Sequence, residues 1–223
     1  MRKTTMAALA LGCAITAAAQ EAVESYEYNE FYYQRSSLFE LLPVEEGDIV
    51  FFGNSLTNGC EWHELFDNPR IKNRGVSSDV IQGLADRCQA VMSGHPDKVF
   101  VLTGVNDVSH NLSPDSIAAA MEALIATMKE ISPSTRIYLQ SMLPINNDFG
   151  RYRKLAGKEA VIVESNRLLE QVAERQRVTW IDLYAAFADD QGKLPAHLTN
   201  DGLHLLGEGY LVWRDAVAKY VEE

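Results

Sequence analysis

Short apolar runs alternate with amphipathic stretches along most of the chain. Five runs have the length and residue types of strands: Asp48–Gly53, Ile71–Gly75, Lys98–Thr103, Arg136–Gln140 and Val178–Leu183. Between them, apolar residues recur at helical spacing over residues 79–91, 113–131, 158–175 and 205–221. Alternating strands and helices favour right-handed crossovers, and wholly apolar runs are typical of strands buried on both faces. The pattern predicts one α/β domain over residues 47–223, with a parallel sheet covered by helices on both faces.

The first residues have a different pattern, typical of an export signal. Arg2 and Lys3 precede an apolar stretch from Met6 to Ile15, and small residues at 17–19 stand before Gln20. The stretch is too short for an ordinary transmembrane helix. We therefore predict a signal peptide over residues 1–19 and export to the periplasm or the extracellular space, with lipidation of Cys13 as an alternative.

Residues 20–46 form an acidic, aromatic leader between this signal and the domain. Phe31, Gln34, Leu38 and Leu41 recur at helical spacing, and Pro43 ends the pattern. The aromatic side chains could bind a sugar, but we expect them to pack the helix onto the domain.

Composition narrows the class of protein. The chain has 223 residues, of which 47% are hydrophobic and 23% charged, as in globular domains. Its 20 Lys and Arg against 31 Asp and Glu give a net charge of −11. Removing residues 1–19 would leave 18 against 31, a net charge of −13, because only two cations lie there. An acidic surface repels phosphate backbones, so we expect no nucleic-acid partner.

Cysteine and histidine spacing gives no sign of a metal site. No Cys-x-x-Cys pair occurs, and the histidines outside the motif described below follow no zinc-ligand spacing. We therefore expect neither metal nor cofactor. Cys60 and Cys88 could form a disulfide after export or remain separate buried thiols, and the spacing leaves both open.

Four polar segments stand where the predicted strands end or where the last helix begins. They are Gly53–Thr57, Asn73–Gly75, Gly104–Asp107 and Asp201–His204. In an open parallel sheet, sites form at the carboxyl ends of the strands. We therefore expect these segments to lie together.

Ser55 is the candidate nucleophile, because it follows the first strand at a turn where its hydroxyl can stand above the sheet. A serine needs a base. Asp201 and His204 are three residues apart, so the carboxylate can hold one ring nitrogen and leave the other facing the serine. Taken singly, Ser55 and Asp201 are also typical helix caps.

Gly75 and Asn106 are candidate donors to an oxyanion. Ester hydrolysis passes through a tetrahedral oxyanion, which needs donors where its charge develops. A glycine N–H can approach closely, and an asparagine amide is a donor that cannot ionise. Each residue is also common in turns.

In this order, the four segments resemble the four sequence blocks of the SGNH hydrolases, also called GDSL esterases and lipases. The resemblance implies a flavodoxin-like three-layer α/β/α fold with five parallel strands, and hydrolysis of carboxylic esters without a metal. It makes Ser55 the nucleophile, His204 the base and Asp201 its orienting residue. It also implies an oxyanion hole made by the N–H groups of Ser55 and Gly75 and the amide of Asn106.

One position departs from the family pattern, since Asn54 stands where an Asp usually precedes the nucleophile. The short chain and Trp62 look most like the platelet-activating-factor acetylhydrolase-like and carbohydrate acetylesterase branch. We take Asn54, Trp62 and Tyr152 as candidate substrate-binding residues. Tyr152 lies in a basic run, Arg151–Lys154, which could meet an acidic substrate or simply be solvated.

The leading interpretation is an exported serine esterase that removes short acyl groups, above all acetyl, from a small substrate such as an acetylated sugar. One alternative is a lysophospholipase or arylesterase of the same family, and another is a non-catalytic carbohydrate-binding relative. A metal-dependent hydrolase using Asp107, His197, Asp201 and His204 would need a strand-end Asp-x-His that the sequence lacks. The sequence leaves the oligomeric state open.

Overall fold

The structure, a computed structural model, describes residues 27–223. The predicted signal peptide and Cys13 lie outside these residues, as does the first part of the leader. No helix within the described part combines the length and apolar character needed to cross a bilayer.

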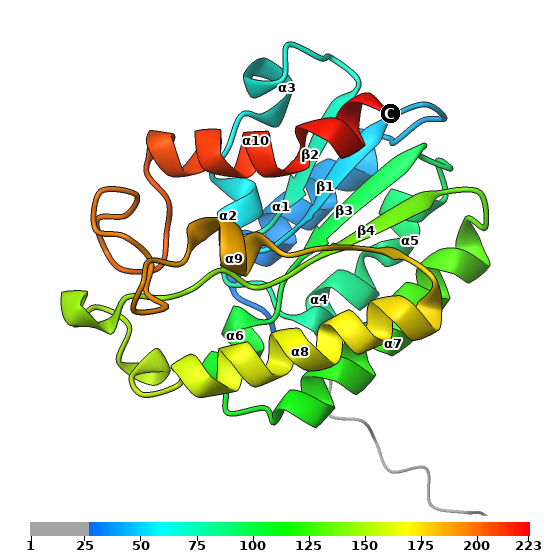
Figure 1. Cartoon of the computed structure of the whole chain (residues 1–223). Coiled ribbons are helices and arrows are strands. Elements are labelled where there is room, and N and C mark those ends of the chain that lie inside the picture. Colours follow the sequence, from blue (N-terminus) through cyan, green and yellow to red (C-terminus); the bar gives the residue numbers. More distant parts are fainter. Residues whose placement is uncertain (1–26) are drawn as a thin grey trace, which may run out of the picture.

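Five parallel strands form the centre of the molecule (Figure 1). They are β1 (Ile49–Gly53), β2 (Ile71–Gly75), β3 (Lys98–Leu102), β4 (Arg136–Gln140) and β5 (Thr179–Ile181). Their order in the sheet is β2-β1-β3-β4-β5. β2 is added on one side of β1, and β3, β4 and β5 follow on the other side, so the strand order changes direction between β1 and β3. The predicted three-layer, five-stranded α/β fold is confirmed.

Successive side chains of each strand enter two separate cores. Val50 and Phe52 pack with one set of helices, whereas Phe51 packs with the other. The first set comprises α4 (Ile81–Asp86), α5 (Cys88–Met92), α6 (Val105–Ser109), α7 (Pro114–Ile131) and α8 (Glu159–Gln176). The second comprises α2 (Ser55–Asn58), α3 (Trp62–Leu65), α9 (Leu183–Phe187) and α10 (Gly207–Glu222). Burial on both faces explains why the strand sequences are apolar throughout.

The cores also separate the two cysteines. Cys60 lies in the core beside α10 and Cys88 in the core on the other side of the sheet, and both are free thiols. Burial raises the pKa of Cys60 to about 12 and that of Cys88 to about 11.

Two predicted elements differ from those observed. The helix expected over 79–91 is divided into α4 and α5 at Arg87, whose buried guanidinium donates to the Asp79 carboxylate and to two backbone carbonyls. Satisfying this buried cation takes precedence over a continuous helix. β5 ends at Ile181 because Asp182 accepts a hydrogen bond from Ala185 N–H and caps α9.

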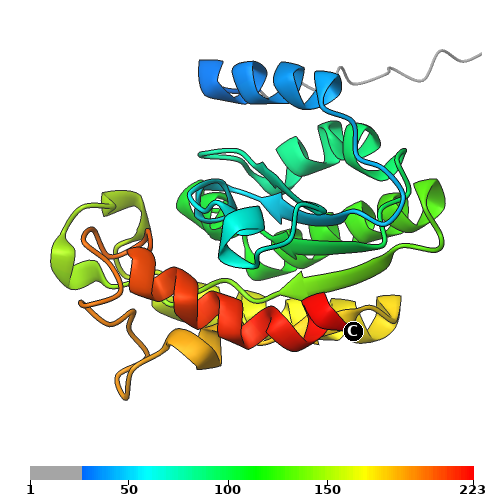
Figure 2. The same cartoon turned by 90° about the horizontal axis from the view of Figure 1, so that it is seen from above.

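The leader contains α1 (Glu30–Leu41), which lies outside the layer formed by α4 and α5 (Figure 2). The side chains that pack inward are Tyr32 and Phe39, which are 7% and 5% exposed. The apolar stripe read from the sequence faces solvent instead: Leu38 is 40% exposed and Leu41 78%. The hydrophobic pattern therefore predicted the helix correctly, but the face that it predicted to pack on the domain is the exposed one.

The long connection from β4 to α8 contains two short 3-10 helices, η1 (Asn147–Phe149) and η2 (Arg153–Leu155). It touches the loop before α10, where Asn146 N–H donates to the Gly202 carbonyl at 2.8 Å. Gly202 has φ +87°, and a Cβ there would lie 2.1 Å from the Asn146 carbonyl oxygen. Glycine is thus what allows these two loops to meet.

Candidate active site

The polar segments that the sequence predicts at the strand ends converge on one edge of the sheet. α2 and α6, which follow β1 and β3, lie at the same edge of the sheet as the loops around 142–157 and 195–205, although the two helices cover opposite faces (Figure 1). Ser55 begins α2 and Asn106 lies in the first turn of α6. Asp201 and His204 come from the loop just before α10.

Ser55, His204 and Asp201 form a continuous chain of hydrogen bonds. The Ser55 Oγ lies 2.9 Å from His204 Nε2, and His204 Nδ1 lies 2.8 Å from Asp201 Oδ2. With the ring proton on Nδ1, the carboxylate accepts it and Nε2 is left to accept from the serine hydroxyl. A base in this arrangement can remove the serine proton.

The Asp201 carboxylate is held by its own loop. Its Oδ1 accepts from the N–H groups of Leu203 and His204 at 2.9 and 2.8 Å, so the spacing of three residues closes a tight turn. Burial alone would raise the pKa of Asp201, but hydrogen bonds from His204, from these N–H groups and from Tyr152 outweigh it and lower the pKa to about 2. The carboxylate is therefore ionised throughout the neutral range.

Tyr152 contacts this pair directly. Its hydroxyl donates to Asp201 Oδ2 at 2.8 Å and lies 2.9 Å from His204 Nδ1. The rings of Tyr152 and His204 meet edge to face at 5.6 Å. The sequence singled out Tyr152 only as a substrate contact, so its position against the Asp–His pair was missed.

Two other predicted substrate contacts are wrong, because both side chains are fully buried. Asn54 is the N-cap of α2, and its Oδ1 accepts from Leu56 N–H at 3.0 Å. Trp62 stacks on Phe51 at 4.0 Å and donates from its indole N–H to the Thr57 carbonyl. Because Asn54 supplies the cap, Ser55 is the first residue of α2 and not its cap.

Gly75 has a packing role that the oxyanion prediction did not anticipate. Its N–H already donates to Asn73 Oδ1 at 2.8 Å, and a Cβ on Gly75 would lie 2.2 Å from Asn58 N. The Asn73 amide also donates to the carbonyls of Thr57, Asn58 and Cys60. Asn73 and Gly75 therefore fasten α2 to β2, and the predicted role of Gly75 as an oxyanion donor is wrong.

The loop after Gly75 offers a replacement donor. Ser78 has φ +65°, and it lines the pocket that contains Ser55, His204 and Asn106. Within residues 27–223, no acceptor is found for the backbone N–H of Ser55 or Ser78. A non-glycine residue held at positive φ next to a candidate nucleophile is a common sign of a functional constraint.

Asn106 is tied to the same loop. Its amide nitrogen donates to the Asp79 carbonyl at 2.8 Å, which leaves its second N–H for a ligand. Both carboxylate oxygens of Asp107 accept from the Ile81 N–H, each at 3.3 Å. These bonds, with the Arg87–Asp79 ion pair at 2.8 Å, hold the loop around Ser78 against α6.

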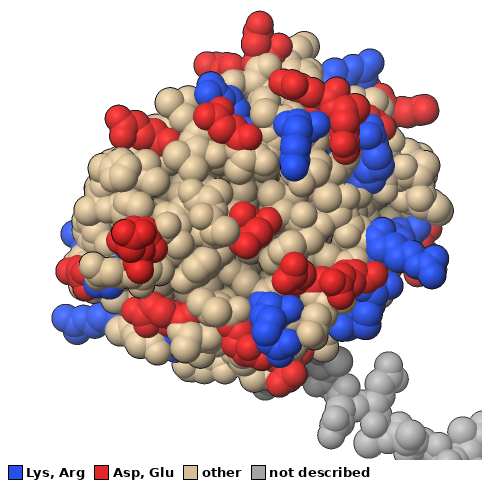
Figure 3. Space-filling model, in the orientation of Figure 1, with Lys and Arg blue, Asp and Glu red and all other residues tan. Residues whose placement is uncertain are grey.

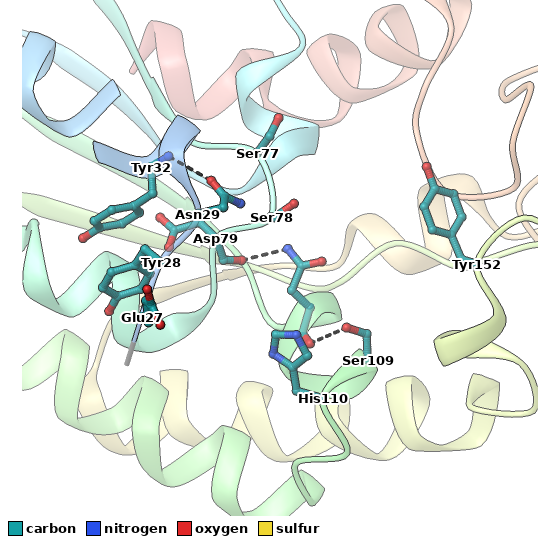
Figure 4. Close-up of a pocket in the computed structure, with 11 residues that line it drawn as sticks. Glu27, Tyr28, Asn29, Tyr32, Ser77, Ser78, Asp79, Ser109, His110 and Tyr152 are labelled. Carbon is teal, nitrogen blue, oxygen red and sulfur yellow. Dashed lines mark hydrogen bonds between the residues drawn. The ribbon is translucent and has the colours of Figure 1, made fainter. Parts of the chain in front are cut away.

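Two adjoining pockets open at this site. One, of about 520 Å³, contains Ser55 and His204 and is bounded on one side by residues 151–155. The other, of about 340 Å³, shares Ser77, Ser78, Asn106, Ser109 and Tyr152 and extends to the leader. Figure 4 shows Tyr152 on one side of this second pocket and Glu27, Tyr28 and Tyr32 on the other.

The described residues contain no group of three or more His, Cys, Asp or Glu side chains placed to hold a metal ion. His197 therefore does not join Asp107, Asp201 and His204 in such a group.

The chain is similar to several known proteins. A model of the GDSL-like lipase/acylhydrolase family matches residues 51–212. The chain is 25% identical over 173 residues to the platelet-activating factor acetylhydrolase IB subunit alpha2 of Rattus norvegicus, covering 74% of this chain and 72% of the relative. A GDSL-like lipase from Bacteroides thetaiotaomicron superposes with a TM-score of 0.75 at 23% identity, covering 86% and 97% of the two chains. An acetylxylan esterase from Geobacillus stearothermophilus gives 0.65 at 20% identity, covering 79% and 94%.

Proposed function

Since the chain belongs to the GDSL-like lipase/acylhydrolase family, we propose that it is a serine esterase acting through Ser55, His204 and Asp201. The observation that carries the proposal is the Ser55–His204–Asp201 chain of hydrogen bonds, with contacts of 2.9 and 2.8 Å, at the wall of an open pocket. Three candidate oxyanion donors belong to residues that line this pocket: the N–H groups of Ser55 and Ser78 and the amide of Asn106.

In the first half of the reaction, Ser55 Oγ attacks the carbonyl carbon while its proton passes to His204 Nε2. Asp201 stabilises the imidazolium through Nδ1. The three donors stabilise the oxyanion of the tetrahedral intermediate. His204 then gives the proton to the leaving alcohol, and the acyl group remains on Ser55.

In the second half, a water molecule replaces the alcohol. His204 Nε2 takes one proton from the water as its oxygen attacks the acyl carbon, and the same donors stabilise the second oxyanion. Collapse of this intermediate returns the proton to Ser55 Oγ and releases the carboxylic acid. The groups that take part in this cycle are the triad, the three donors and water.

We propose acetyl as the acyl group, released from a small substrate such as an acetylated sugar. The support is that the similar proteins include an acetylhydrolase subunit and an acetylxylan esterase by name. Hydrolysis of acetyl esters in preference to esters of longer fatty acids, at equal alcohol, is the expected result. A preference for long acyl chains would favour the lipase or lysophospholipase alternative.

The test is hydrolysis of p-nitrophenyl acetate by the protein and by Ser55→Ala. We expect the substitution to lower kcat by about 10⁴-fold or more, because the nucleophile is removed. Asp201→Asn should cost less, since it disturbs orientation and electrostatics but leaves nucleophile and base in place. Ser134→Ala, an exposed serine outside the site, is the matched control. Activity that survives Ser55→Ala would contradict the mechanism, and a folded protein inactive on every acyl ester would favour a binding protein.

We also propose that residues 1–19 direct export and are then removed. The support is the basic start, the apolar stretch and the small residues before Gln20. N-terminal sequencing of the exported protein should begin at Gln20. A mature protein that begins at Cys13 with the added mass of a lipid would show the lipoprotein alternative, and a retained Met1 in the cytoplasm would contradict export.

A further inference from the structure

Three cations form one wall of the pocket that contains Ser55 and His204. Arg151, Arg153 and Lys154 all line it, and no Asp or Glu is among its lining residues. A neighbouring pocket of about 460 Å³ shares Arg153 and Lys154, adds Lys158, and again is lined by no carboxylate. This is unusual in a chain with 31 acidic and 20 basic residues.

These three cations have no ion-pair partner among the described residues. Several other exposed arginines do have one: Arg167 pairs with Glu164 at 2.6 Å, and Arg175 with Glu122 at 2.7 Å. On a chain rich in carboxylates, unpaired cations gathered beside a candidate nucleophile leave a local positive potential.

The cationic wall is fastened to the site and is not merely a solvated loop. Tyr152, between Arg151 and Arg153, is bonded to Asp201 and accepts from Leu155 N–H at 2.9 Å. Leu155 follows Lys154 and is 3% exposed, packed into the core beneath α8. The backbone that bears the three cations is thus held at both the triad and the core.

The acidic groups near the site do not neutralise this wall. Asp201 is paired with His204 and Asp79 with Arg87. Glu27 lines the adjoining pocket, on the side opposite Tyr152, and does not line the pocket that contains Ser55 (Figure 4). Burial lowers the pKa of His110, and the charges of Lys154 and Lys158 lower it further.

From this arrangement we infer that the alcohol portion of the substrate carries an anionic group, a carboxylate or a phosphate, which the wall of Arg151, Arg153 and Lys154 binds while Ser55 attacks the acyl carbon. The inference rests on the proposed esterase function. A short acyl group leaves most of the 520 Å³ pocket to the alcohol portion. Guanidinium groups fit both carboxylate and phosphate oxygens in a two-point geometry.

The experiment compares acetyl esters that differ in a single group. Mono-O-acetyl glucose, the matching glucuronic acid and the matching glucose 6-phosphate share one ring and differ only at C6. We expect kcat/KM to be about tenfold higher for the anionic esters than for the neutral one, mainly through KM. Raising NaCl to about 0.5 M should reduce the difference, because salt screens charges exposed to solvent.

The variant Arg151→Gln/Arg153→Gln/Lys154→Gln should abolish this preference, because kcat/KM for the two anionic esters should fall to that for the neutral ester. The matched control is Lys129→Gln/Arg177→Gln/Lys219→Gln, which removes the same charge near the ends of α7, α8 and α10. It should keep the preference. The three single variants, checked by circular dichroism, replace the triple variant if that protein fails to fold.

The outcomes separate the two proposals. Equal kcat/KM for all three sugars, or a preference that survives the triple variant, overturns the cationic-wall inference even if p-nitrophenyl acetate is hydrolysed. No hydrolysis of p-nitrophenyl acetate by the folded protein overturns the esterase proposal itself. A preference for one anion over the other supports the inference and identifies the group.

Discussion

At the residue scale, Ser78 carries an unusual constraint. Its φ of +65° lies in the left-handed region, where a residue with a Cβ is less stable than glycine by about 1 kcal/mol. The bonds that hold this loop, from Asn106 to the Asp79 carbonyl and from Arg87 to the Asp79 carboxylate, keep Ser78 in this conformation. Ser78 is thereby held among the residues that line the pocket of Ser55 and His204.

Substituting Ser78 separates the backbone donor from the hydroxyl. Ser78→Gly should raise the free energy of unfolding by about 1 kcal/mol, because glycine adopts positive φ readily. Both Ser78→Gly and Ser78→Ala should keep kcat within a few-fold if the N–H is the donor. Urea unfolding and p-nitrophenyl acetate kinetics measure the two effects. A loss of about 10²-fold in Ser78→Ala would show that the hydroxyl donates instead.

Asn106 is the donor whose side chain can be removed. Asn106→Ala should lower kcat by about 10²- to 10³-fold with little change in KM, since the bond strengthens only as the oxyanion forms. Asn111→Gly, in the exposed turn after α6 where φ is +68°, removes a nearby asparagine side chain without backbone strain and is the control. Unchanged kcat in Asn106→Ala would remove it from the oxyanion hole.

Tyr152 is a positioning residue, since it acts through Asp201 and His204. Tyr152→Phe removes a donor to Asp201 Oδ2, so we expect kcat on p-nitrophenyl acetate to fall by about three- to tenfold. The pKa of Asp201 should rise from about 2 toward its ordinary value, while the carboxylate stays ionised at neutral pH. NMR titration of the carboxyl signal measures this rise, which a purely structural role would not cause. Tyr33→Phe on the exposed side of α1 is the control.

At the element scale, aromatic contacts join α3 to β1 and α10. Trp62 lies 4.0 Å from the Phe51 ring and 4.9 Å from the Trp213 ring. Trp62→Ala should lower the free energy of unfolding by about 3–5 kcal/mol, as truncation of a buried aromatic side chain leaves a cavity. Urea unfolding measures the loss. A raised KM with unchanged stability would instead restore Trp62 as a substrate contact.

Element identity was more predictable than element limits. The helix α7 begins as its sequence indicates, with Ser113 as N-cap and Pro114 in the first turn, because capping depends on neighbouring residues alone. The break at Arg87 depends on acceptors in β1 and β2, and no local pattern contains those.

At the scale of the whole molecule, pH should act through the buried Asp107. Burial raises its pKa from 3.8 to about 7, so between these values the folded chain binds a proton that the unfolded chain has lost. The contribution of Asp107 to the free energy of unfolding is therefore fully present below about pH 4 and is lost as the pH rises to about 7. Three pKa units correspond to about 4 kcal/mol.

Asp107→Asn should weaken this dependence. The free energy of unfolding, measured in urea from pH 4 to 8, should fall less steeply in the variant than in the parent protein. Asp79, whose pKa burial raises to about 6, contributes in the same direction and remains in both. Asp115→Asn, at the exposed start of α7, is the control and should leave the slope unchanged. Parallel curves for the parent and Asp107→Asn would contradict the assignment.

The distribution of charged side chains also differs between the surface as a whole and the site. Acidic and basic side chains are interspersed over the face in Figure 3, whereas the site pocket has a wall of one sign. The overall balance of −11 argues against a polyanionic partner but says nothing about the field inside one pocket.

The sequence by itself determined the strand–helix order, the parallel sheet and the approach of Ser55, Asp201 and His204. These follow from local periodicity and from the rule that parallel strands end at one edge.

Only the tertiary structure decided which nearby groups face the pocket. Gly75 and Ser78 are three residues apart, yet one N–H is taken by Asn73 and the other is not. Trp62 and Tyr152 were both predicted to bind substrate. Packing buries Trp62, whereas the hydroxyl of Tyr152 contacts Asp201. Contacts between segments distant in sequence set burial and hydrogen-bond partners, so short motifs cannot reveal them.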